Sequence, residues 1–183
     1  IVAQTLALGG SIRANGGSVD GGGGASGGSG GGIRIDVGTI SGTGTISANG
    51  TPGGGTTGGG GGGGRIAIYY QNATGFNFGN VSTFGVTGPN ATIAGSGTVY
   101  LQGVTQENGE LIVDNNNLAA PSLSTPILGV SSATISLTNF RVRRGARATL
   151  NSILNVAATL DVSGAEFSAA NRTRHHVGSG VHL

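Results

Sequence analysis

Apolar and polar residues alternate along many short segments of this chain, and most of the apolar positions are β-branched. A period of two predicts strands with one buried face, whereas no apolar 3.6-residue period typical of a helix runs for ten residues. Asn and Gly lie between the segments, as expected of turns. The predicted strands are 4–8, 33–37, 45–48, 65–70, 97–102, 110–113, 133–137, 140–143, 148–150 and 159–162.

The chain also contains an internal repeat. Residues 11–16 align with 45–50 at a shift of 34, and the strand that follows each copy returns at a shift of 33. Repeats of this length are typical of solenoids, in which each unit buries its apolar face against the next. We therefore predict an all-β fold, a right-handed parallel β-helix (solenoid), with a closed β-sandwich as the alternative.

Forty of the 183 residues are glycine, and two dense tracts, 21–32 and 53–64, each lead directly into a predicted strand. Because glycine loses the most backbone entropy on ordering, one interpretation is a pair of flexible loops extruded from the β-helix. The other is polyglycine-II, in which extended left-handed threefold helices pack side by side because no Cβ prevents close approach. The spacing of the interruptions leaves both interpretations open.

The composition changes near Gly103, after which glycine becomes sparse and Leu, Val, Ala and Asn dominate. We predict a glycine-rich repeat half at 1–103, regular β-helix coils at 104–170 and a polar tail at 171–183. Within the second region, 148–151 and 158–164 are interpreted as successive coils about ten residues apart. The whole is predicted to be one solenoid with two glycine-rich excursions.

Charge and cysteine content narrow the possible functions. Charged residues make up 9% of the chain, all nine basic residues are arginine, and the formal net charge is +2. Without interleaved basic and aromatic residues, this balance does not indicate nucleic-acid binding. The absence of cysteine excludes a disulfide framework, the absence of lysine excludes a Gly-Lys-Ser/Thr phosphate loop, and no apolar run is long enough for a membrane helix.

No set of residues has the pattern of a catalytic, cofactor or metal site, so we predict none of these. Glu107 and Glu110 flank Gly109 in a predicted turn, and an acid/base pair made by them is the basis of the polysaccharide-cleaving alternative. The three histidines lie within 175–182 beside glycine and arginine, and we interpret them as part of the tail rather than as metal ligands.

Arginines form the one cluster of charge. On a strand, Arg141 and Arg143 share a face, with Val142 on the other. One interpretation is a solvated edge, and the other is a contact patch for an acidic polysaccharide or a neighbouring subunit. The residues of this possible contact patch are Arg141, Arg143, Arg144 and Arg147.

Several segments combine glycine with β-branched alternation: 30–35, 41–50, 61–70, 97–101 and 110–115. Through them the chain resembles the glycine-rich repeat regions of large bacterial surface proteins, including autotransporter-passenger and haemagglutinin-like adhesins. The resemblance covers roughly residues 9–165. It implies a secreted protein, built on a right-handed β-helix, that acts in adhesion or envelope structure. The family has no shared catalytic motif, so no functional residue carries over.

We therefore predict a non-enzymatic structural or adhesive segment of an extracellular surface or filament protein. Neither end shows a capping helix, so copies of the chain or flanking repeats are the expected partners. Surface polysaccharide is a further expected partner, whereas nucleic acid, membrane insertion and cofactors are not expected. The alternatives are a polysaccharide-binding or polysaccharide-cleaving β-helix and a phage-tail-type or ice-binding polyglycine module. Ice binding needs a flat threonine array, for which Thr39, Thr43 and Thr45 are too short a set.

Overall fold

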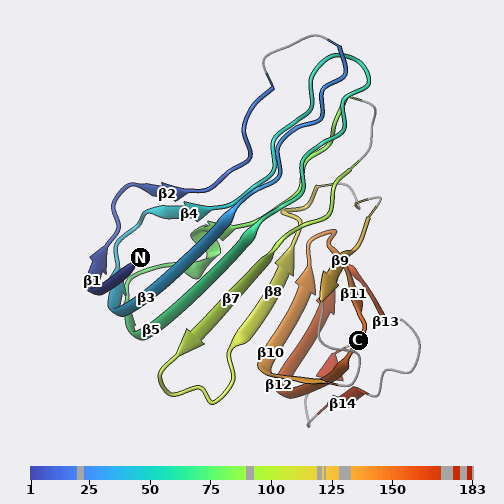
Figure 1. Ribbon diagram of the computed structural model, residues 1–183. Coiled ribbons are helices and arrows are strands. Elements are labelled where there is room, and N and C mark those ends of the chain that lie inside the picture. Colours follow the sequence, from blue (N-terminus) through green and yellow to red (C-terminus); the bar gives the residue numbers. More distant parts are fainter. Residues whose placement is uncertain are drawn as a thin grey trace.

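The computed structural model describes residues 1–19, 23–89, 93–118, 121, 123–127, 133–169, 175–177 and 181–182. These residues form an all-β fold, as predicted, with one 3-10 turn, η1 (Phe78–Asn80), and no closed sheet. A nine-stranded sheet has the order β1-β3-β5-β7-β8-β10-β12-β14, with β15 beside β12 (Figure 1). The sheets β2-β4-β6 and β13-β11-β9 are separate from it.

The strands are β1 (Val2–Ala7), β2 (Ser11–Arg13), β3 (Gly32–Ser41), β4 (Thr45–Ser47), β5 (Arg65–Thr74), β6 (Val81–Ser82), β7 (Thr98–Gly103), β8 (Glu110–Asp114), β9 (Thr125–Ile127), β10 (Thr134–Arg143), β11 (Arg147–Leu150), β12 (Ile153–Ser163), β13 (Glu166–Ala169), β14 (His175–Val177) and β15 (Val181–His182). Strand pairing thus reaches into the segment expected to be a polar tail, because β14 and β15 both pair with β12.

The internal repeat determines the register of the first half. β1, β3, β5 and β7 are parallel neighbours, and Val2 pairs with Asp36, Gly32 with Arg65 and Arg65 with Thr98. Parallel neighbours need a crossover connection. Each repeat supplies one by adding a short strand to the β2-β4-β6 sheet and then a glycine-rich passage that leads to the next long strand.

The glycine-rich passages run side by side, projecting away from the sheets (Figure 1). Hydrogen bonds between their backbones recur every third residue in both partners, at 2.5–3.3 Å, whereas a β-ladder repeats every second residue. The donor–acceptor pairs are Gly28–Gly17 and Gly31–Ala14, Thr51–Gly28 and Gly54–Ala25, Gly61–Thr51 and Gly64–Ala48, Ala94–Val86 and Gly97–Thr83, and Gly27–Gly59 and Gly30–Gly62. The passages are therefore hydrogen-bonded to one another with a period that differs from that of a β-ladder.

Strand direction reverses between β7 and β8, which are antiparallel. The later long strands are again parallel to one another. Residues of β10 pair with residues of β12 that lie 19 or 20 positions later in the sequence, as in the pairs Thr134–Ile153 and Asn139–Thr159. The prediction that 148–151 and 158–164 are successive coils ten residues apart is wrong. β11 and β12 lie in different sheets and pair with different strands, so ten residues correspond to half of the observed repeat.

Two hydrophobic cores lie on opposite faces of the nine-stranded sheet. The first contains Ile68 and is covered by β2, β4 and β6; the second contains Phe140 and is covered by β9 and β11. β8 contributes to both, since Ile112 packs in the first core and Val113 in the second, and successive strand residues point to opposite faces. The covering strands therefore change face where the strand direction reverses.

Candidate functional site

The structure brings together three of the four arginines predicted as a contact patch. Arg141 and Arg143 lie on β10, on the face opposite the second core, and Arg144 directly follows that strand. Arg147 lies on β11, in another sheet, where it forms an ion pair with Glu166. We call the three grouped arginines and their acidic partners the charged face. It consists of Arg141, Arg143, Arg144, Glu110, Asp114 and Asp161.

Arg141 lies between two carboxylates on neighbouring strands. Its Nε donates to Glu110 of β8, and its Nη1 is 3.5 Å from Asp161 of β12. Three arginines thus face three carboxylates, and the formal charge of the charged face is zero. Such a face does not provide the excess positive potential that attracts an acidic polysaccharide.

Asp114 holds the other two arginines and the turn that follows β8. The Nε atoms of Arg143 and Arg144 each donate to this carboxylate at 2.8 Å, and the backbone N–H of Asn116 donates to it at 2.8 Å. The Asp114 side chain is only 13% exposed. Its loss would leave two guanidinium groups and one N–H without their acceptor.

We therefore expect Asp114→Ala to lower the free energy of unfolding by about 1–3 kcal/mol, less than for a fully buried ion pair because the arginines are partly exposed. The matched control is Glu166→Ala, whose side chain is 56% exposed; its expected cost is below about 1 kcal/mol. Urea denaturation followed by circular dichroism measures both. Equal effects would contradict the anchoring role of Asp114.

A hollow of about 460 Å³ lies beside the charged face and is lined by Tyr70, Phe78, Glu110 and Arg141, among others. The rings of Tyr70 and Phe78 pack with their centroids 5.0 Å apart. Burial, and then the charge of Glu110, raise the pKa of Tyr70. The Glu110 carboxylate in this hollow already accepts from Arg141.

The other sequence candidates do not assemble into a site. Glu110 is engaged by Arg141, and Glu107 is exposed in the turn after β7. Thr39 and Thr45 lie in strands of different sheets, so they do not share one flat array. The histidines of 175–182 lie in β14 and β15. Within the described ranges, no group of three His, Cys, Asp or Glu side chains is placed to hold a metal ion.

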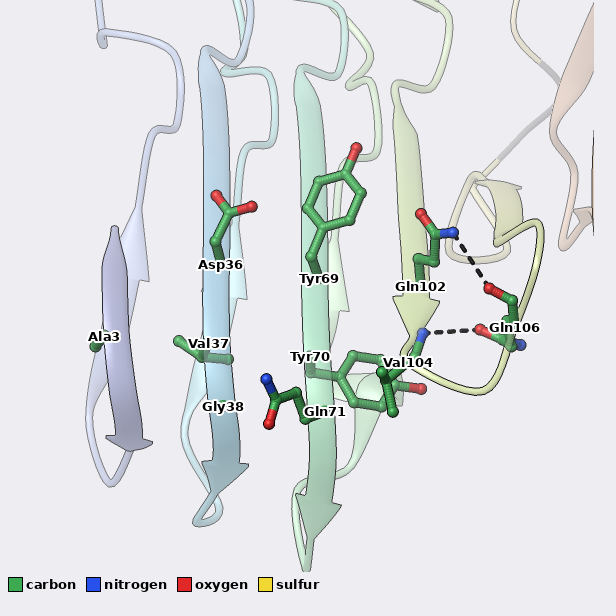
Figure 2. Close-up of a pocket in the computed structure, with 11 residues that line it drawn as sticks. Ala3, Asp36, Val37, Gly38, Tyr69, Tyr70, Gln71, Gln102, Val104 and Gln106 are labelled. Carbon is green, nitrogen blue, oxygen red and sulfur yellow. Dashed lines mark hydrogen bonds between the residues drawn. The ribbon is translucent and has the colours of Figure 1, made fainter.

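A second hollow, which sequence reasoning missed, lies on the opposite face of the sheet from the charged face and spans β1, β3, β5, β7 and the turn after β7 (Figure 2). Its volume is about 410 Å³. Asp36, Tyr69 and Gln102 lie side by side in register across three strands. We call it the tyrosine hollow, and the lining residues used below are Asp36, Gly38, Tyr69, Gln71, Gln102 and Gln106.

Hydrogen bonds fix one wall of the tyrosine hollow. The Tyr100 hydroxyl donates to Gln102 Oε1 at 3.1 Å and accepts from the Gly109 N–H at 3.0 Å. Gln102 Nε2 donates to the carbonyl of Gln106 at 3.3 Å, and Gln106 Oε1 accepts from the Gly103 N–H at 2.9 Å (Figure 2). The wall is therefore ordered without a ligand.

Aromatic packing fixes the centre of the hollow. The ring centroids of Tyr69 and Tyr100 are 5.7 Å apart, and the Cζ atom of Arg34 is 4.8 Å from the ring centroid of Tyr69. Arg34 also forms two hydrogen bonds with Asp36, and this interaction lowers the pKa of the Asp36 carboxyl. The sequence contained one signal for this site: Asp36, Tyr69 and Gln102 are successive solvent-face positions of the 33-residue repeat.

Comparison with protein-family models, with curated proteins and with solved structures finds no match to this chain. In the part of the chain that the structure describes, no helix is both long and apolar enough to traverse a bilayer. Functional inference therefore depends on the geometry of the two faces and of the glycine-rich passages.

Proposed function

We propose that this chain is a non-enzymatic structural and adhesive segment of an extracellular surface or filament protein, and that it associates with copies of itself. We further propose that its long strands wind as a right-handed parallel β-helix and that its glycine-rich passages form a polyglycine-II bundle. The observation that supports this most strongly is the three-residue period of the hydrogen bonds between the passages.

Side-chain space in the second tract supports the same period. At Gly59 and Gly62 the nearest atom to an added Cβ is 3.5 Å away, in ordinary contact. At the glycines between and after them, an added Cβ would overlap backbone atoms of a neighbouring passage; these are Gly60, Gly61, Gly63 and Gly64. One open position in three is what a threefold helix within a bundle requires. A bundle of this kind is a stiff projection that needs no disulfide.

The edge of the nine-stranded sheet supports self-association. Among the described strands, β1 pairs only with β3, and its other side is open. Val2 on this strand is 86% exposed and Ile1 is 55% exposed. An open edge with exposed apolar residues can accept a strand from another chain. Because neighbouring repeats already pair in parallel at nearly the same register, with shifts of 34 and 33, a second copy can continue this parallel pairing.

We expect the chain to sediment as an oligomer at micromolar concentration and the double variant Val2→Lys/Gln4→Lys to sediment as a monomer, because edge charges oppose strand addition. Leu123→Lys is the control, since Leu123 is 67% exposed but lies away from β1. Sedimentation velocity measures all three. A monomeric parent chain would overturn self-association.

The non-enzymatic proposal has a separate test, incubation of the chain with polysaccharides. Polysaccharide turnover that is lost in Glu107→Gln or Glu110→Gln would overturn it.

A further inference from the structure

The tyrosine hollow keeps polar groups free although its wall is ordered. Gln71 is exposed and reaches from β5 toward Gly38 of β3. The Tyr69 hydroxyl points away from the strand (Figure 2). Neither side chain hydrogen-bonds to the described part of the chain. The Asp36 carboxylate, bound to Arg34, still has lone pairs available. The hollow therefore presents donors and acceptors on a rigid sheet.

These groups match the chemistry of a sugar. Adjacent hydroxyls of a pyranose ring both donate and accept, and a planar carboxylate or amide can bind two of them at once. The C–H bonds of the ring pack against an aromatic side chain, which Tyr69 supplies. A volume of about 410 Å³ lies within the usual range of small-ligand sites. Gly38, at the buried floor of the hollow, leaves room for the side chain of Gln4, which a Cβ at this position would overlap.

Charge and position narrow the class further. Arg34 and Asp36 neutralise each other, so the hollow lacks the excess positive charge that a uronate or sulfated sugar would require. A polypeptide that adds as a strand needs a sheet edge, whereas Asp36, Tyr69 and Gln102 lie on the faces of β3, β5 and β7, which are each paired on both sides. We infer that the tyrosine hollow binds a short segment of a neutral polysaccharide. This inference depends on the adhesive part of the proposed function and not on self-association.

Affinity electrophoresis through native gels that contain mannan, dextran or xyloglucan tests the inference, with alginate and polygalacturonate as acidic probes. We expect at least one neutral polysaccharide to retard the chain. Gln71→Ala and Asp36→Asn should each weaken that binding about three- to tenfold, the usual effect of losing one or two hydrogen bonds. Asn72→Ala is the matched control, because Asn72 is the next exposed residue of β5 and does not line the hollow.

The exposed Gln71 side chain makes no hydrogen bond or ion pair with the described residues, so a loss of binding in Gln71→Ala at an unchanged melting temperature would support the hollow as the site. Equal binding by Gln71→Ala and Asn72→Ala would overturn this location. Binding only to the acidic polysaccharides, or to none of the five, would overturn the neutral saccharide as ligand. Sedimentation of the same samples reports self-association separately, so the two proposals can fail independently.

Discussion

Replacing Gly61 by alanine is expected to lower the free energy of unfolding by about 1–3 kcal/mol, the usual cost of inserting a methyl group into a packed interior. At Gly61 the new Cβ would overlap the carbonyl of Gly28 in the neighbouring passage. Neither residue is an exposed loop position, since the Gly61 N–H also donates to the Thr51 carbonyl at 2.9 Å. The two passages would have to separate to accommodate the methyl group.

The adjacent substitution, Gly62→Ala, is the matched control. Its Cβ would lie 3.5 Å from the nearest atom, the Gly95 carbonyl oxygen. It should leave stability unchanged or raise it by about 0.4–1 kcal/mol, because alanine restricts the unfolded chain. Urea denaturation of both variants checks the contrast. If residues 58–64 were a flexible loop, the two substitutions would behave alike, and equal midpoints would contradict the bundle.

Phe140→Ala should have the largest effect of any single substitution discussed, a loss of about 3–5 kcal/mol. Phe140 is fully buried in the second core. Its ring packs edge-to-face against that of Phe167, with the ring centroids 5.4 Å apart. Without cysteines, no crosslink compensates for the cavity. The control is Ile153→Ala on the adjacent β12, where the side chain is 36% exposed and the expected loss is below about 1 kcal/mol.

Thermal and urea unfolding followed by far-UV circular dichroism measures the Phe140 variant. Because the two cores share β7 and β8, the loss is expected in a transition that includes the second half of the sheet. A Phe140→Ala midpoint within experimental error of the Ile153→Ala midpoint would show that the second core does not stabilise the fold.

The sequence predicted strands well where apolar residues alternate strictly. Residues 65–70 form the start of β5, and the repeat shift of 33 became the strand register. Residues 133–137 and 140–143 were predicted as two strands but belong to the single strand β10. Its register shifts between Leu137 and Asn139, so the core positions Leu137 and Phe140 are three residues apart and the alternation is interrupted.

Other features depend on strand direction, which alternation does not encode. The antiparallel pairing of β7 and β8 has the same apolar period as a parallel pairing, so the reversal had no signature in the sequence. Likewise, the arginine cluster looked continuous, but Arg144 and Gly145 have positive φ values of 52° and 81° and turn the chain into another sheet before Arg147. The tyrosine hollow was missed because its residues are 33 positions apart and form no local motif.

The reversal at β7 and β8 also determines what the molecule displays on each side. The hand of a crossover depends on the strand direction, on the direction in which the sheet grows and on the face that the crossover covers. At β8 the strand direction and the covered face are both inverted, whereas the sheet continues to grow in the same direction. The two inversions cancel, so crossovers before and after the reversal have the same hand. The uncovered faces are inverted as well. A second copy that adds to β1 in parallel, through its own β1 or through β14, has its two faces exchanged. Tyrosine hollows and charged faces would therefore alternate along each side of the resulting ribbon.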